Sequence, residues 1–309
     1  MATPRHVSST DGVRLAVYES GDPGATTVLA VHGYPDNHTV WDGVSELLAE
    51  RFHVVTYDVR GTGQSDQPAP QRAYRMDRLV DDLGAVLDAV SPDAPVHLLA
   101  HDWGSVQCWP ALTDERFAGR IASFTSISGP SLDHAAAWLR RAHRHPRAAA
   151  RQLLDSYYIA LFQLPVLPEA IMRSRRVERL LAAAGRVGSS AADRTNGLKL
   201  YRANMLPRLG RPRPERIDVP VQVLAPSRDA FVSPRMQLEA PAPYVADLTA
   251  RRISGRHWVL AERPDVIARC TAEFIGCVEN GAAAHPNCSP STSAQRPAAF
   301  SNAISSSSR

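Results

Sequence analysis

Short apolar runs alternate with segments of helical periodicity along most of the chain. Helical spacing of apolar residues is clearest over Met76–Val90, and further helices are expected over Val40–Glu50, from Trp103 onward and over Pro264–Val278. The runs between them have the length and apolar content of strands: Val13–Glu19, Thr27–Val31, His53–Tyr57, Val96–Ala100, Ile121–Ile127, Val219–Leu224 and, more weakly, Arg251–Ile253. This alternation predicts an α/β protein whose parallel sheet is covered by helices on both faces.

The strand pattern stops between Gly129 and about Ile217. This stretch is rich in Arg and Ala, has helical character and contains no strand-like run. We therefore expect residues 1–129 and 217–280 to form one core, with residues 130–216 inserted into it as a helical cap. Residues 281–309 are rich in Ser, Ala and Pro and lack periodicity, so we expect a disordered tail.

Composition indicates a soluble globular protein, with 44% hydrophobic and 21% charged residues. No apolar run is long enough to cross a membrane, and the N-terminus lacks the pattern of a secretory signal, so we predict a cytoplasmic location. The four cysteines lack the spacing of metal ligands. The net charge of +4 comes almost entirely from Arg, since Lys199 is the only lysine. No nucleic-acid partner is expected.

Arginines cluster between Arg140 and Arg151, in the sequence RRAHRHPRAAAR. A solvated helix face is the expected reading of such a run, and contact with a phosphate or a membrane surface is the alternative. The glycine-containing segment DVRGTGQSD, residues 58–66, lacks the spacing of a phosphate-binding loop. We expect it to be a structural turn.

A carboxylate stands at the end of one predicted strand. Asp102 follows the run Val96–Ala100, and a helix is expected to begin at Trp103. Reactive groups gather at the carboxyl ends of parallel strands. The small residues Ala100 and Gly104 flank the site, as a sharp strand-to-helix turn carrying a nucleophile requires. Asp102 is thus either a nucleophile on a strained turn or an ordinary cap of the following helix.

Two later residues favour the interpretation of Asp102 as a nucleophile over that of a helix cap. Asp229 follows the strand Val219–Leu224, and His257 follows the last strand, so the order along the chain is nucleophile, acid, histidine. Either one alone could be a turn residue or a surface histidine. The loop His32-Gly33-Tyr34-Pro35 follows Thr27–Val31, where the amides of Tyr34 and Trp103 are expected to form an oxyanion hole.

The motifs HGYP, DVRGTGQSD, AHDWG, SRD and GRHW resemble those of the epoxide hydrolase branch of the α/β-hydrolase superfamily, from about Val13 to Val278. The chain also resembles the hydrolase half of bacterial proteins in which this domain is fused to a short-chain dehydrogenase. The resemblance implies an α/β-hydrolase fold: a mostly parallel central sheet flanked by helices, with a helical cap inserted after the sixth strand.

Two cap tyrosines are implied by the same resemblance. SYYIALFQLP is similar to the family's first tyrosine motif and aligns Tyr158, with Tyr157 as the other register, and KLYRANM is similar to the second and aligns Tyr201. Each could instead be a core tyrosine. In the family, two such tyrosines donate hydrogen bonds to the epoxide oxygen.

The resemblance implies a two-step hydrolysis without metal or cofactor. Asp102 would open the epoxide and form an ester, and His257, oriented by Asp229, would activate the water that releases a vicinal diol. A carboxylate suits this chemistry because its ester can be hydrolysed, whereas the ether formed by a serine cannot readily be cleaved. The apolar stretch LFQLPVLP, residues 161–168, indicates a lipophilic epoxide as substrate.

Two other functions stay open at this point. A haloalkane dehalogenase uses the same Asp, His and acid but needs two N–H donors for the halide. Trp103 supplies one, but the family's Asn is Tyr34 here, and Trp138 is poorly placed to replace it. The chain could also be a truncated, non-catalytic module that binds lipids or a partner, because no dinucleotide motif follows Val278. The sequence sets neither stereochemistry nor oligomeric state.

Overall fold

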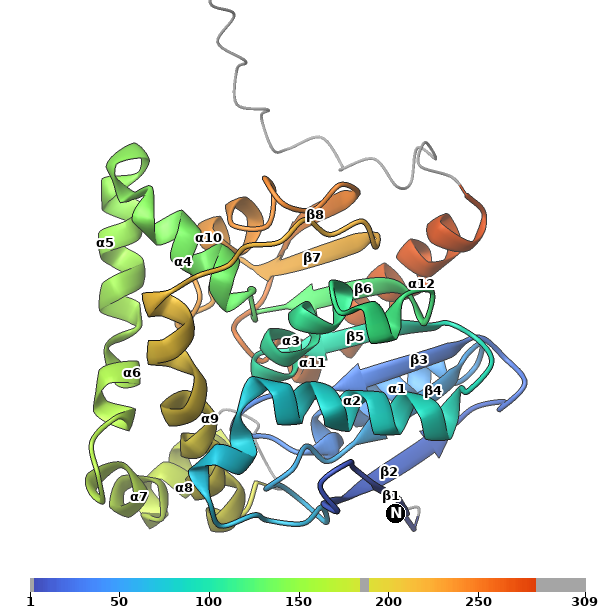
Figure 1. Cartoon of the computed structure of the whole chain (residues 1–309), viewed down its shortest axis with the longest axis horizontal. Helices are drawn as coiled ribbons and strands as arrows, with labels where there is room; N and C mark the ends of the chain where they lie inside the picture. Colours follow the sequence, from blue (N-terminus) through green and yellow to red (C-terminus); the bar gives the residue numbers. More distant parts are fainter. Residues whose placement is uncertain (1–2, 184–188, 282–309) are drawn as a thin grey trace, which may run out of the picture.

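The central sheet contains eight strands within the described residues, 3–183 and 189–281, of the computed structural model. Their order is β1-β2-β4-β3-β5-β6-β7-β8; the first two pairings are antiparallel and the rest parallel (Figure 1). The strands are β1 (Arg5–Ser8), β2 (Arg14–Ser20), β3 (Thr27–Val31), β4 (His53–Tyr57), β5 (Val96–His101), β6 (Ile121–Ile127), β7 (Val221–Pro226) and β8 (Leu248–Ile253). The expected mostly parallel sheet is confirmed.

The largest differences from the predicted elements lie at the edges of the sheet, whereas the interior strand β7 begins and ends two residues later than predicted. The sequence pattern does not predict β1, because only Val7 of its four residues is buried and no alternation is visible. The other edge strand, β8, begins at Leu248, three residues before the predicted start, since its partly exposed residues give only a weak apolar signal. An edge strand packs on fewer neighbours, so its sequence is less constrained.

Helices cover both faces of the sheet. Alternate residues of one strand point to opposite faces: Leu29 and Val31 pack with α2 (Met76–Val90) and α3 (Trp103–Cys108), whereas Val28 and Ala30 pack with helices of the other face. The helices on that second face are α1 (Asp42–Leu48), α11 (Val259–Glu262) and α12 (Pro264–Glu279). Two apolar layers thus hold the strands in place, and the carboxyl ends of the parallel strands are left at one edge.

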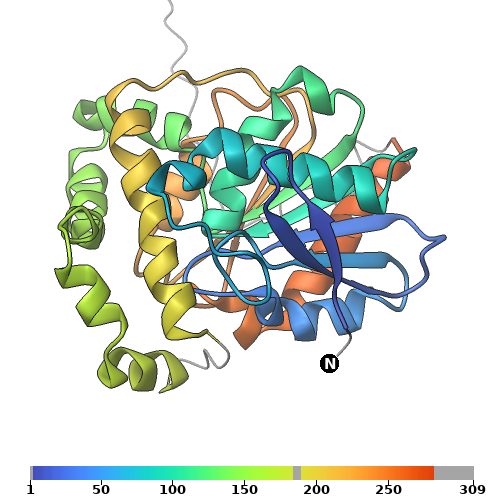
Figure 2. The same cartoon turned by 60° about the horizontal axis from the view of Figure 1, so that its bottom comes forward.

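After β6 the chain leaves the sheet and returns only at β7. The described residues between these strands form helices and no strand: α4 (Leu132–Arg140), α5 (Pro146–Asp155), α6 (Tyr157–Phe162), α7 (Leu167–Met172), α8 (Arg175–Ala183) and α9 (Ala191–Gly210). They stand beyond the carboxyl ends of the parallel strands, and α9 lies between α5–α7 and the sheet (Figures 1 and 2). The insertion therefore follows the sixth strand, as expected.

The helix α9 is anchored to the sheet side by polar contacts. Asn204 accepts a 2.8 Å hydrogen bond from the amide of Met76 and donates one of 2.8 Å to the carbonyl of Tyr74. Gly197 permits a close approach, because a Cβ there would collide with the ring of Tyr34. Across residues 3–183 and 189–281, no helix is both long and apolar enough to traverse a bilayer. The predicted tail lies, from residue 282 onward, outside the described residues.

Candidate active site

Asp102 occupies a sharp turn between β5 and α3. Its φ is +51° and its ψ −125°, a conformation that is costly for a residue with a side chain and that concentrates at functional sites. A Cβ at position 104 would collide with the carbonyl oxygen of Val31, so the helix can begin this close to β3 only with Gly104. The turn holds the carboxylate of Asp102 above the carboxyl end of the sheet.

The loop after β3 approaches the same carboxylate. The amide of Tyr34 donates a 2.7 Å hydrogen bond to Oδ1 of Asp102. A Cβ on Gly33 would lie 2.5 Å from that oxygen, so this contact depends on glycine. His32 anchors the loop, because its Nε2 accepts a 2.9 Å hydrogen bond from the amide of Val59. The main-chain N–H of Tyr34 is thereby fixed toward Asp102.

His257 lies between two carboxylates. Its Nδ1 is 3.1 and 3.2 Å from the two carboxylate oxygens of Asp229, and its Nε2 is 3.6 Å from Oδ2 of Asp102. Asp229 is oriented in turn, since its Oδ1 accepts hydrogen bonds of 2.9 and 3.1 Å from the amides of Phe231 and Val232. The structure therefore brings together the three residues that the sequence places far apart.

The charges of this trio are coupled. Burial lowers the pKa of His257, but Asp229 and Asp102 outweigh it and raise the pKa to about 10. Burial raises the pKa of each carboxyl, but the charge and hydrogen bonds of His257, together with neighbouring hydrogen-bond donors, outweigh it, so both pKa values fall below the usual one. At neutral pH, His257 is thus an imidazolium between two carboxylates, and Asp102 is ionised, as a nucleophile must be.

Tyr158 and Tyr201 face Asp102 from the inserted helices. Their ring centroids are 5.9 Å apart, and their hydroxyls interact with each other. Burial raises the pKa of both phenols far above 10, so each keeps its proton. Tyr157, the other register of the sequence alignment, is 72% exposed and makes no part of this cavity. Two proton donors thus converge on the space above the carboxylate.

That space is a mostly apolar cavity of about 130 Å³. Asp102 and Trp103 lie on its sheet side, and most of the rest comes from α4, α5, α6, α9 and the segment before α10 (Pro234–Glu239). The apolar side chains that line it include Leu132, Leu139, Leu153, Ile159, Met205, Leu209 and Phe231. The cavity is small and mostly apolar, and a few polar groups point into it. Small-molecule sites in proteins usually combine these features.

Sequence reasoning missed three residues that support the trio. Gln237 donates a 3.1 Å hydrogen bond to Oδ2 of Asp229. Nε2 of His101 lies 2.9 Å from the carbonyl oxygen of His257. The ring of Phe231 packs edge-to-face on His257, with centroids 4.8 Å apart. His101 lies within the AHDWG motif, but the motif does not show that its ring meets the backbone of His257, and no quoted motif includes Gln237 or Phe231. These roles depend on which elements meet in the fold.

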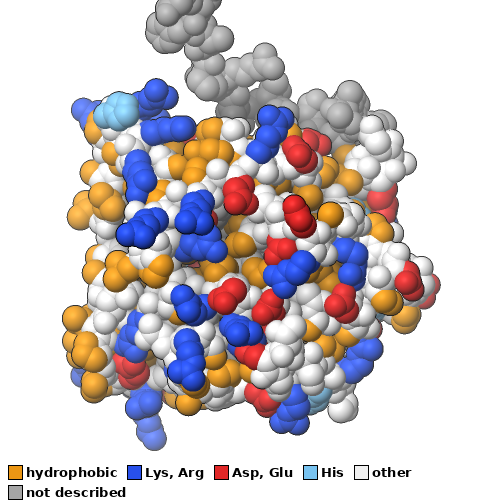
Figure 3. Space-filling model, in the orientation of Figure 1, with side chains coloured by type: hydrophobic (Ala, Val, Ile, Leu, Met, Phe, Trp, Pro, Cys, Tyr) orange, Lys and Arg blue, Asp and Glu red, His pale blue; other side chains and the backbone are white. Residues whose placement is uncertain are grey.

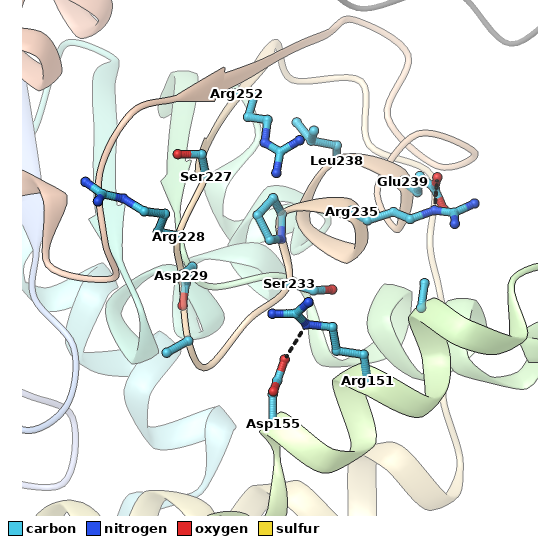
Figure 4. A pocket seen from close by; sticks show the side chains of 13 residues that line it. Arg151, Asp155, Ser227, Arg228, Asp229, Ser233, Arg235, Leu238, Glu239 and Arg252 are labelled. Atoms are coloured by element: carbon cyan, nitrogen blue, oxygen red, sulfur yellow. Dashed lines mark hydrogen bonds and ion pairs between the residues drawn. The ribbon is translucent and has the colours of Figure 1, made fainter.

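A larger open pocket of about 680 Å³ lies on the other side of the Asp229 loop (Figure 4). Arg151, Arg228, Arg235 and Arg252 line it together with Asp155 and Glu239. The side chain of Asp229 is fully buried, so this pocket does not give access to its carboxylate. The smaller apolar cavity, which contains Asp102, is therefore the candidate active site.

The side chain of Trp138 makes its contacts outside the cavity that contains Asp102. Its indole N–H donates a 3.0 Å hydrogen bond to Glu239, and its ring stacks on His145. It does not line the cavity that contains Asp102. The segment 58–66 is the structural turn expected from its sequence, since Arg60 is buried within it and bonded to Asp11 and Asp82.

Known proteins resemble this chain in sequence. The family described as alpha/beta hydrolase fold matches residues 26–264. The probable oxidoreductase EphD of Mycobacterium tuberculosis is 41% identical over 291 residues, which cover 87% of this chain and 49% of EphD. Epoxide hydrolase A of the same organism is 33% identical over 197 residues, covering 62% of this chain and 58% of that protein. The chain thus spans about half the length of these relatives.

Solved structures share the architecture. An epoxide hydrolase from Bacillus megaterium, crystallised with an inhibitor, superposes with a TM-score of 0.73 over 88% of this chain and 100% of that chain, at 21% sequence identity. At this identity the likeness concerns the fold.

Proposed function

We propose that this chain, which belongs to the alpha/beta hydrolase family, is an epoxide hydrolase that converts a lipophilic epoxide and water to a vicinal diol through a covalent aspartyl ester. One observation carries the proposal: an ionised carboxylate on the strained turn faces two protonated tyrosines across an apolar cavity. The name of the related epoxide hydrolase A supports the same reaction.

Ring opening uses Asp102 and the two tyrosines. Oδ1 of Asp102 accepts the hydrogen bond from Tyr34, which leaves Oδ2 to attack an epoxide carbon. The C–O bond of the epoxide breaks as the new C–O bond to Oδ2 forms. The departing oxygen takes a proton from Tyr158 or Tyr201, because an alkoxide is a stronger base than a phenolate. The product of this step is a hydroxyalkyl ester of Asp102.

Hydrolysis of the ester uses His257. Esterification removes the negative charge of Asp102, which is one of the two charges that raise the pKa of His257. The imidazolium then loses its proton to solvent, and the tyrosinate left by ring opening regains a proton from solvent, so both side chains are neutral before hydrolysis. Neutral His257, held by Asp229, removes a proton from a water that attacks the ester carbonyl. The amides of Tyr34 and Trp103 stabilise the oxyanion, and the diol leaves with the original Oδ2.

Helices α4–α9, residues 130–216, act in this proposal as the cap. They bring Tyr158 and Tyr201 to the cavity that contains Asp102. The apolar lining selects a lipophilic epoxide. A halide would need a second N–H donor, and the indole of Trp138 is already bonded to Glu239.

Trapping the intermediate tests the mechanism. In a His257→Gln variant of the full chain mixed with styrene oxide, intact-mass spectrometry is expected to show an adduct of one epoxide on Asp102, while diol formation stops. His257→Gln combined with Asp102→Asn is the matched control and should stay unmodified. A His257→Gln protein that turns over normally, or an adduct mapped to another residue, contradicts the mechanism. Halide release from 1-bromobutane without diol formation would indicate a dehalogenase instead.

A further inference from the structure

The helices α5 to α7 expose large apolar side chains along one edge of the molecule. Six of them are between 46% and 76% exposed; we call them the apolar edge: Leu153, Leu154, Tyr157, Leu164, Val166 and Leu167. Exposed apolar side chains that are scattered over a surface need no explanation. A group of them in one stretch indicates a site that contacts another protein or a membrane.

Arginines flank the apolar edge on both sides. Residues 152–172 contain no Arg or Lys, whereas Arg140, Arg141, Arg144, Arg147 and Arg151 precede them and Arg173, Arg175, Arg176 and Arg179 follow. All nine are exposed. Figure 3 shows both hydrophobic and basic side chains along the edge of the molecule where α5, α6 and α7 lie in Figure 1.

This segment holds more positive charge than the whole protein. Residues 140–181 contain nine arginines and three acidic residues, a net charge of +6, while the entire chain has +4. Two of the three carboxylates are already paired, Asp155 with Arg151 and Glu169 with Arg202. Arg141, Arg144 and Arg147 have no ion-pair partner among the residues that the structure describes. The surface is therefore complementary to an anionic partner.

Helix α5 combines both features on one face. Arg147, Arg151 and Leu154 are spaced four and three residues apart, so they lie on the same exposed side of the helix. Helices that lie in a membrane interface have this arrangement, with apolar side chains entering the acyl region and arginines reaching the headgroups.

The cavity is continuous with the apolar edge. Leu153 lines the cavity that contains Asp102 and is also 61% exposed. Leu153 therefore belongs both to the apolar edge and to the lining of the cavity.

We propose that the apolar edge and its flanking arginines dock this protein on an anionic phospholipid bilayer, from which a lipid-dissolved epoxide enters beside Leu153. The entry route rests on the proposed function, whereas the docking surface does not. A second copy of the chain fits less well, because a symmetric contact would bring two sets of unpaired arginines together. Each arginine near an anionic surface adds favourable free energy that salt screens.

Vesicle sedimentation tests the docking without any epoxide. The full chain is expected to bind phosphatidylglycerol vesicles at least about tenfold more tightly than phosphatidylcholine vesicles, and to be released as salt is raised. Arg144→Glu with Arg147→Glu should weaken binding at least about tenfold, and Leu154→Ser with Val166→Ser should also weaken it. None of these four residues lines the cavity. Equal binding to both lipids, or binding that all variants retain, overturns the proposal.

The matched control substitutions lie on the α/β core, outside the apolar edge and its flanking arginines. Leu47→Ser removes an apolar side chain that is 42% exposed on α1, and Arg216→Glu reverses an exposed charge before β7; both should leave vesicle binding unchanged. Concentration-dependent dimers that the Leu154→Ser and Val166→Ser changes abolish, without vesicle binding, would identify a second copy as the partner and contradict the lipid. Hydrolysis of a water-soluble epoxide by every variant separates failed docking from failed catalysis.

Discussion

The amide of Tyr34 lies 2.7 Å from Oδ1 of Asp102, in direct hydrogen-bond contact. This contact joins the loop after β3 to the turn after β5, and the glycine before Tyr34 makes it possible. It also distinguishes the two oxygens of the carboxylate, because only Oδ1 receives the hydrogen bond from Tyr34. The predicted chemistry depends on this distinction: one oxygen attacks and the other becomes the carbonyl.

Gly33→Ala should lower kcat/KM by about 10²-fold or more, because the added Cβ would lie 2.5 Å from Oδ1 and displace the Tyr34 amide. Diol formation by the purified variant provides the measurement. Gly276→Ala is the control, since a Cβ there meets nothing within 4 Å and its host helix α12 favours alanine. Full activity in Gly33→Ala would show that the amide is not needed.

Tyr158→Phe and Tyr201→Phe should each lower kcat/KM for an epoxide by roughly 10²-fold, and the double variant by more, because each removes one proton donor. Initial rates of diol formation with a terminal epoxide measure the effect. Tyr157→Phe, on an exposed side chain, should change nothing. A double variant that is as fast as the natural sequence would exclude the tyrosines from catalysis.

Arg60→Met should destabilise the fold by about 3–5 kcal/mol, because Arg60 and Asp82 form a fully buried pair and the variant leaves a buried carboxyl unpaired. For a protein of this size, a loss of several degrees in Tm is expected. Thermal unfolding followed by circular dichroism provides the measurement. Adding Asp82→Leu should recover part of the loss; if it lowers Tm further, the unpaired charge is not the cause.

Stability should fall in alkaline solution because of His257. Its pKa rises from 6.5 to about 10 in the folded protein, so the stabilisation is complete below pH 6.5 and is lost as the pH rises through about 10. His257→Gln removes this group and should flatten the decline of Tm between pH 6.5 and 10. Parallel Tm profiles of the two proteins across this range would refute the ion-pair arrangement.

At low pH, stability should change with pH in the opposite direction and fall as the pH falls. The pKa values of Asp102 and Asp229 are lowered in the folded protein, so their contribution is present above the ordinary carboxyl pKa of 3.8 and is lost as the pH falls through their folded values. Asp229→Asn should therefore make Tm less sensitive to pH below about 4. Unchanged acid sensitivity in that variant would mean that other carboxyls, such as buried Asp58, dominate.

The linear sequence determined the alternation of strands and helices, the helical insertion after the strand Ile121–Ile127 and the order Asp102, Asp229, His257. These features are local: an apolar run, a helical period or a small residue beside a sharp turn acts within a few positions of the chain. The same reasoning failed at β1 and at the start of β8, where few residues are buried and the local signal is weak.

Only the tertiary structure decided which oxygen of Asp102 meets the Tyr34 amide and that Gln237 holds Asp229. It also decided that Leu153 is at once exposed and part of the cavity. The physical reason is the same in each case. Such contacts join elements that are distant in the chain, and their geometry is set by how helices pack on the sheet, which no local pattern encodes.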